Sequence, residues 1–130
     1  MKKLFLAIFI SGFSFQAIAS FTDTLLTGTW KGTSICQIKS SPCHDEISVC
    51  HISKTDKEGI YRLIMNKMVN GVEEDMGVLD FTYDAVAGTL SYKDETHNAE
   101  WKFSIKGKTM DGTAIVKGQL YRIIKLTKEK

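Results

Sequence analysis

Hydrophobic and polar residues alternate along most of the chain in short runs. A period of two is the spacing of a β-strand that buries one face. Outside the first 19 residues, no stretch of ten or more keeps the 3.6-residue period of an amphipathic helix. The pattern predicts a lead-in over 21–27 with room for a turn of helix. It then predicts strands over 28–38, 46–54, 60–69, 75–83, 89–94, 100–106, 110–116 and 120–127.

Short turns rich in glycine, asparagine and aspartate separate these runs. Asn70-Gly71 is the clearest turn, because both residues tolerate the positive φ angles of a two-residue hairpin. Connections this short make neighbouring strands antiparallel. A flat sheet of eight such strands would have two open edges, and closure removes both. We therefore predict an all-β fold, an eight-stranded antiparallel up-and-down barrel.

Alternation also predicts which side chains point into the barrel. The expected inward residues are Leu79, Phe81, Tyr83, Leu90, Tyr92, Trp101, Phe103 and Ile105, and in the last strand Leu120, Arg122, Ile124 and Leu126. For the segments 46–54 and 60–69, alternation does not decide which face points inward. Tyr61, Leu63 and Met65 share one side of 60–69, whereas Ile60 and Ile64 share the other.

The first 19 residues have the order of a secretory signal peptide. Met1-Lys2-Lys3 is a positive start, an apolar run follows over 4–15, and Ala17-Ile18-Ala19 has small residues where a signal peptidase cuts. The apolar run is shorter than the roughly 20 residues that cross a bilayer. We therefore expect a cleaved leader over 1–19 and one exported domain over 20–130, periplasmic or secreted, with no membrane span.

The net charge of the chain bears on whether its partner is a nucleic acid or a membrane surface. The whole chain has a formal net charge of +2, with Lys+Arg 17 and Asp+Glu 15. Loss of the leader removes two lysines and no acid, so the mature domain is formally neutral. A nucleic-acid-binding domain and a polybasic membrane-surface binder both need a basic excess. The balance argues against both.

The three cysteines of the mature chain are Cys36, Cys43 and Cys50. Exported cysteines are expected to be oxidised, and three of them allow three single bridges. Cys36–Cys43 is favoured because it would cross a tight hairpin, whereas Cys43–Cys50 would join the start of a strand to its own middle. Cys50 is then a free thiol. It is either a small apolar wall residue or a reactive thiol that would allow a disulfide dimer of a monomeric protein.

The run Leu26-Thr27-Gly28-Thr29-Trp30-Lys31-Gly32 opens the first strand, and its Gly-x-Trp resembles the start of calycin-superfamily barrels. These are the lipocalins, the fatty-acid-binding proteins and their small bacterial relatives. More narrowly, the chain is similar to small exported bacterial lipocalin-like proteins at Cys36, Ser41-Pro42-Cys43-His44, Asn70-Gly71 and Tyr121-Arg122-Ile123-Ile124-Lys125. The resemblance implies that Trp30 plugs the closed end of the barrel and that Arg122 lies across its face.

No motif points to catalysis, a metal or a cofactor. Cys43-His44 and Cys50-His51 repeat a Cys-His pair, but adjacent strand residues point to opposite faces and cannot bind one ion together. Glu73-Glu74-Asp75 has too few oxygen ligands for calcium. It is interpreted as a solvated turn that blunts strand edges, with a docking surface as the alternative. We expect no enzyme, because no nucleophile, base and orienting group can be named.

Two functions remain. The first is a binding module that holds a small apolar or amphipathic ligand at one barrel mouth. Its pocket would be lined by Met65, Phe81, Tyr83, Tyr92, Trp101 and Phe103. The second is an interaction protein, as in the small periplasmic protease or lysozyme inhibitors of the same superfamily shape. It would act through the 21–26 lead-in or the Ser40-Ser41-Pro42 loop. An open apolar mouth favours the first function. A barrel filled by its own side chains, with a protruding loop, favours the second.

Overall fold

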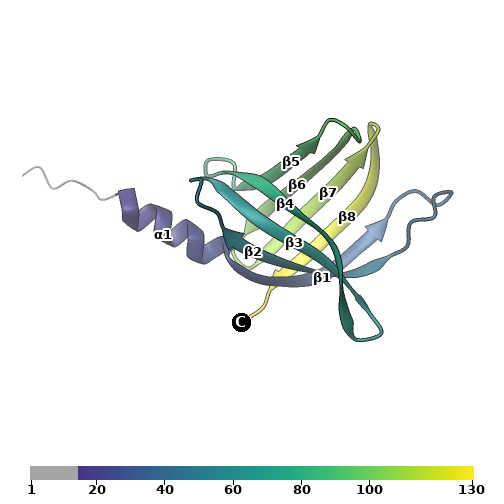
Figure 1. Cartoon of the computed structure of the whole chain (residues 1–130), viewed down its shortest axis with the longest axis horizontal. Helices are drawn as coiled ribbons and strands as arrows, with labels where there is room; N and C mark the ends of the chain where they lie inside the picture. The colour runs from purple at the N-terminus through teal and green to yellow at the C-terminus, as the bar shows by residue number, and fades with distance from the viewer. Residues whose placement is uncertain (1–14) are drawn as a thin grey trace, which may run out of the picture.

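A computed structural model describes the backbone of residues 15–130 and the side chains from Phe21 onward. The chain begins there with one helix, α1 (Phe15–Leu26), which projects from one end of the molecule (Figure 1). The expected leader over 1–19 lies mostly outside the described residues, and its last part forms the start of α1. The expected cleavage point after Ala19 therefore falls within α1.

Eight strands follow α1 and form a closed barrel in chain order (Figure 1). They are β1 (Gly28–Cys36), β2 (Glu46–Lys54), β3 (Ile60–Val69), β4 (Val72–Asp84), β5 (Thr89–Asp94), β6 (Ala99–Lys106), β7 (Thr109–Val116) and β8 (Gln119–Lys128). The predicted all-β up-and-down barrel is confirmed. The bounds of β2, β3 and β5 are as predicted, whereas β4 begins at Val72 rather than at residue 75.

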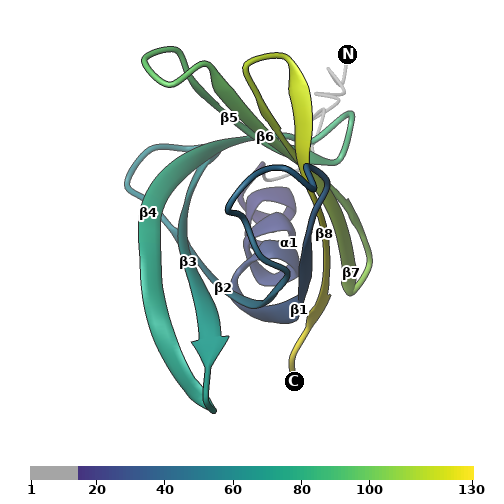
Figure 2. The same ribbon diagram turned by 90° about the vertical axis from the view of Figure 1, so that its right-hand side faces the viewer.

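Every strand pairs antiparallel with its neighbours, and β8 pairs with β1 to close the barrel. The ladders differ greatly in length. The β3–β4 ladder runs from Ile60↔Thr82 to Val69↔Val72, whereas β4 and β5 pair only at Thr82↔Ser91, Tyr83↔Leu90 and Asp84↔Thr89. Beyond these pairs β4 and β5 diverge, and the β3–β4 hairpin extends past the barrel body (Figure 2).

The core lies inside the barrel, with its largest side chains fully buried. The main buried residues are Leu26, Trp30, Leu63, Phe81, Leu90, Phe103 and Met110. Buried Tyr61 and Leu63 settle the inward face of β3. Leu120 was predicted to face inward, but it is 41% exposed. Ala114 pairs with Arg122 and Ile115 with Leu120, so Tyr121 is an extra residue that reverses the side-chain alternation.

Trp30 closes the barrel end next to α1, as the resemblance implied. The indole is fully buried, and its Nε1–H donates to the Leu26 carbonyl at 2.9 Å. The basic residue over the indole is Lys128, whose Nζ lies 5.8 Å from the ring centroid. The same ammonium donates to the carbonyls of Thr24 and Leu25 at 2.6 and 3.0 Å, at the carboxyl end of α1. The expected role of Arg122 across Trp30 is therefore wrong.

Strand register explains this correction. Trp30 pairs with Lys128, while Arg122 pairs with Cys36. Six residues of extended chain separate the two pairs along β1, which is about 20 Å at roughly 3.3 Å per residue. Arg122 points inward as predicted, but it lies at the opposite end of the barrel. The basic residue over Trp30 does come from β8, but it is Lys128 rather than Arg122.

The cysteines are arranged as predicted. Cys36 and Cys43 form a disulfide across the β1–β2 connection, with their Cα atoms 6.0 Å apart. Cys50 is a free thiol on β2. Such a disulfide is typical of proteins that fold in an oxidising compartment. No helix in the described part of the chain has the length and hydropathy to cross a membrane.

Candidate ligand-binding site

A cavity of about 120 Å³ opens at the barrel end away from α1. The fully buried Leu63, Phe81, Leu90 and Met110 are not among its lining residues and fill other parts of the barrel. Its lining is Ser34, Glu46, Ser48, Val49, Cys50, Met65, Asn66, Met76, Trp101, Phe103, Arg122, Ile124 and Leu126.

Arg122 dominates the polar side of the cavity. Its Nη1 donates to the Ser34 hydroxyl at 3.1 Å and to the His44 carbonyl at 3.0 Å, and its Nη2 lies 3.5 Å from a Glu46 carboxylate oxygen. These contacts join β8 to β1, β2 and the disulfide-bridged connection. A guanidinium has five N–H donors. Within residues 15–130 its Nε–H has no acceptor, so Arg122 can still donate to a ligand.

The apolar side of the cavity is formed by aromatic and sulfur-containing side chains. Trp101 and Phe103 come from β6, and Met65 comes from β3. Ring contacts hold this wall in place: the Tyr92 and Trp101 centroids lie 6.0 Å apart, and those of Phe81 and Phe103 lie 5.7 Å apart. The cavity thus combines a guanidinium and hydroxyls on one side with a rigid apolar wall on the other.

The six residues expected to line one pocket are divided by the structure. Met65, Trp101 and Phe103 line the mouth cavity. Phe81 is fully buried in the core beneath it, and Tyr92 packs between Phe81 and Trp101. Tyr83 lies near the other end of the barrel, 6.1 Å from the Tyr61 ring. Phe81 and Tyr92 therefore support the cavity wall, and Tyr83 is not part of it.

The polar side of the cavity was not predicted from the sequence. Ser34 has the same parity as Trp30 on β1, and Glu46 has the same parity as Cys50 on β2. That parity was a usable signal for both residues. Arg122 was recognised as inward-facing but was assigned to the wrong end.

Cys50 is part of the cavity wall but is unsuited to thiol chemistry. The residue is 2% exposed, and burial raises the pKa of its thiol to about 12. The thiol therefore stays protonated near neutral pH, and only a thiolate is a good nucleophile. A disulfide to a second chain would require the barrel wall to open.

A polar cluster lies where the β3–β4 hairpin meets β2, and it includes Asn66, a buried residue that also lines the mouth cavity. Glu73 accepts hydrogen bonds from Asn66 Nδ2 at 2.8 Å and from His51 Nε2, while His51 Nδ1 lies 3.0 Å from the Thr29 hydroxyl. The bond from Asn66 and then that from His51 lower the pKa of Glu73. The acidic run that begins at Glu73 therefore lies in a strand and anchors the hairpin, rather than forming a solvated turn.

Two further hollows lie on the surface. A groove of about 420 Å³ next to α1 contains Tyr61 and Tyr83, with Asp23 and Lys54 among its charged residues. The Tyr61 hydroxyl donates to Asp23 at 2.5 Å and Lys54 Nζ lies 3.0 Å from the same carboxylate, so Asp23 has a lowered pKa, chiefly through Tyr61.

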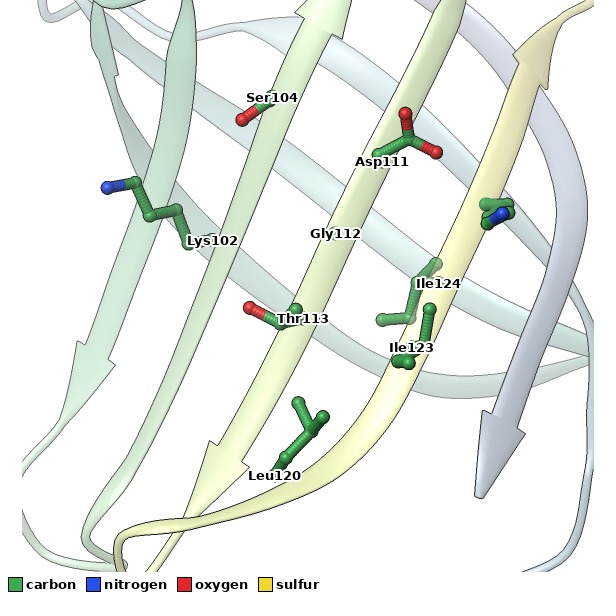
Figure 3. Close-up of a pocket in the computed structure, with 9 residues that line it drawn as sticks. Lys102, Ser104, Asp111, Gly112, Thr113, Leu120, Ile123 and Ile124 are labelled. Carbon is green, nitrogen blue, oxygen red and sulfur yellow. The ribbon is translucent and has the colours of Figure 1, made fainter. Parts of the chain in front are cut away.

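The other hollow, of about 330 Å³, crosses the outer faces of β6, β7 and β8 (Figure 3). Lys102, Ser104, Asp111 and Thr113 project there from β6 and β7, as solvent-facing residues of a sheet do.

Metal-ligand side chains are not gathered in the described part of the chain: no three His, Cys, Asp or Glu side chains are placed to hold one ion. Comparison with known proteins adds no assignment, because no family model matches the chain and a search of curated proteins found no match.

Proposed function

We propose that the protein is a binding module, rather than an enzyme, that holds a small amphipathic ligand in the mouth cavity. The observation that supports this is the two-sided lining of the cavity. Arg122 and Ser34 offer polar groups on one side, while Met65, Trp101 and Phe103 form an apolar wall on the other. Sites for small ligands usually combine a mostly apolar lining with a few convergent polar groups.

The size of the cavity limits the ligand. A dry protein cavity of roughly 150 Å³ holds one benzene molecule. The volume of about 120 Å³ therefore suits a single ring or a short chain that carries one polar group. A long acyl chain would have to displace Leu63 and Phe81, which are fully buried below. We infer a ring-sized or short-chain ligand whose polar group faces Arg122.

Export and superfamily membership are parts of the same proposal. The Cys36–Cys43 disulfide and the charged, apolar and small-residue order of 1–19 support export to the periplasm or the medium. The closed eight-stranded barrel is compatible with a lipocalin-like fold. The Gly-x-Trp at 28–30 supports membership of the calycin superfamily.

Two serines on β2 provide a matched test. Ser48 lines the cavity, whereas Ser53 is exposed on the outer face of the same strand. Ser48→Leu should fill the cavity, and Ser53→Leu should leave it unchanged. We would titrate each variant with benzoate and with benzyl alcohol and follow backbone amide shifts by NMR. Native mass spectrometry of protein purified from its own cell envelope would detect a resident ligand.

The expected result is saturable binding of a probe to the wild type and to Ser53→Leu, with at least a tenfold loss in Ser48→Leu. Any co-purified ligand should be lost from the same variant. Equal behaviour of the two serine variants, or no saturable shifts at residues that line the cavity, would refute the mouth as a ligand site.

A second candidate function is supported by the β3–β4 hairpin. Buried side chains form a core inside the barrel, and the hairpin extends beyond the barrel body with Val72 67% and Met76 53% exposed (Figure 2). We propose that this hairpin, rather than the 21–26 lead-in or the Ser40-Ser41-Pro42 loop, contacts a partner protein. A photo-crosslinking residue at position 72 should give a specific adduct in the cell envelope. The same residue at Val86, which is fully exposed in another turn, should not.

A further inference from the structure

One strand leaves the barrel with a long open edge. β4 pairs with β3 from Val72 to Thr82, with a register shift at Met76, but its pairing with β5 is confined to Thr82–Asp84. Residues 72–81 therefore have no partner strand on the β5 side within the described residues. Figures 1 and 2 show the same divergence, because β5 runs away from β4 as β4 continues toward the hairpin. From Val72 to Val78 every residue is exposed.

The backbone groups on this edge can be assigned. The Tyr83 N–H donates to the Gly59 carbonyl at 2.8 Å, on the β3 side. Hydrogen-bonding direction alternates along an antiparallel strand, so Phe81 and Leu79 also direct their peptide groups at β3. Val78 and Asp80 then direct their N–H and C=O groups at the open side. An edge of this kind is a template for another strand.

Charge decides which strand the edge would accept. β4 carries Glu73, Glu74, Asp75, Asp80 and Asp84 and has neither lysine nor arginine. Two copies of β4 paired antiparallel would place these carboxylates against one another, and like charges on opposed strands destabilise the pair. A second copy of this chain is therefore disfavoured. An incoming strand with lysine or arginine would be attracted instead.

We propose that the open edge of β4, residues 72–81, accepts an extended segment of a partner protein in which basic and apolar residues alternate. This inference deepens the second candidate function and rests on it, and its edge shares one residue, Met76, with the mouth cavity. The added strand would exchange main-chain hydrogen bonds with Val78 and Asp80, as in β-strand addition. Its alternate side chains would face opposite sides of the sheet.

The two faces of the edge explain the alternation. On the outer face lies Asp80, whose carboxylate contacts only one side chain, Arg62 at 3.0 Å, within the described residues. Exposed Glu74 and Asp75 add further negative charge along the edge. On the inner face, Leu79 and Tyr92 are partly buried against the core. Basic side chains therefore suit the outer face, and apolar side chains suit the inner face, on which Leu79 and Tyr92 lie.

The test uses a fluorescein-labelled nine-residue peptide that alternates lysine with valine. One control peptide has the same composition with all lysines before all valines, and a second alternates glutamate with valine. Anisotropy would measure binding, and NMR would follow the amide signals of residues 78 and 80. Val78→Pro removes one outward N–H at an edge position where proline is tolerated. Val78→Thr is the matched control, because it keeps that N–H.

We expect the lysine–valine alternating peptide to bind and to protect the amides of residues 78 and 80 from exchange. Val78→Pro should weaken binding at least fivefold, whereas Val78→Thr should not. Equal binding of the alternating and block peptides would overturn the proposal. Protection of amides elsewhere than on β4 by the peptide would also overturn it. This result needs only the wild type, so it remains accessible if Val78→Pro fails to fold.

Two further outcomes would also overturn it. A dimer that Val78→Pro dissociates would make a second copy the occupant. The crosslinked adduct at position 72 could also persist in Val78→Pro while the protein shows no preference among the peptides. That pair of results would retain the hairpin as an interaction surface and exclude strand addition.

Discussion

Replacing Lys128 by methionine tests the closed end of the barrel most directly. The ammonium of Lys128 donates to two carbonyls at the carboxyl end of α1 and lies over the Trp30 ring. Methionine keeps most of the apolar stem and removes the charge and the donors. The variant therefore isolates the polar contacts of this residue from its packing.

The expected loss follows from those contacts. A hydrogen bond to a charged group contributes about 1.5–3 kcal/mol, and a positive charge at a helix carboxyl terminus adds about 0.3–1 kcal/mol. The cation–π contact contributes about 0.5–1 kcal/mol at an accessible site. Because Lys128 is only half-buried and these contributions overlap, we expect a loss of about 2 kcal/mol. For a domain of this size that is a fall in Tm of about 10 °C.

Denaturant unfolding, followed by tryptophan fluorescence, would measure the change in the free energy of unfolding. The control is Lys125→Met on the same strand, because Lys125 is exposed on the outer face and should lose about 0.5 kcal/mol or less. A double-mutant cycle with Trp30→Phe should show coupling to Lys128→Met. The same cycle with Arg122→Met should be additive, because sites more than about 10 Å apart are usually independent.

Coupling of Trp30 to Arg122 rather than to Lys128 would refute this reasoning. The result would mean that β8 is shifted along β1 by several residues, and Arg122 could then not line the mouth cavity.

Three further predictions concern single residues. Gly32→Ala should cost about 2 kcal/mol or more in unfolding free energy, because an added Cβ would lie 1.8 Å from the Lys125 carbonyl oxygen. The Cys50 thiol should react with a thiol reagent at pH 8 only after unfolding. Its raised pKa should also make stability fall as pH rises from 9.0 toward about 12, because only the unfolded chain loses the proton there; Cys50→Ala should reduce that slope. Asp23→Asn should reduce the loss of stability as pH falls below 3.8. The pKa of Asp23 is lowered in the folded chain, so the unfolded chain takes up a proton at this position first.

The sequence predicted the strands well because each carries a local signal. Alternation marks Leu79, Phe81 and Trp101 as inward, and Asn70-Gly71 marks a two-residue turn, so bounds and barrel order follow from neighbouring residues. An extra residue such as Tyr121 has no comparable signal. It shifts the pairing of β7 and β8 and turns Leu120 outward without changing local composition.

The candidate site depends on distances that the sequence does not contain. Alternation places Phe81 and Trp101 on the same inner face, but whether that space is filled depends on the sizes of side chains from all eight strands. The contact between Trp30 and Lys128 depends on the β1–β8 register, which joins the two ends of the domain. The open edge of β4 arises because β4 is longer than its ladder with β5. The length of a ladder depends on how the two strands curve, and the sequence does not contain that information.

Closure by the last strand has a consequence for the order of folding. β1 must wait for β8, because Trp30 and Lys128 meet across nearly the whole domain, and contacts between distant residues form slowly. A chain that emerges amino end first would therefore present β1 with one unsatisfied edge until its carboxyl end arrives. A product truncated within β8 would keep that edge permanently and expose another on β7. Such fragments should aggregate or be degraded, so β8 should tolerate shortening poorly.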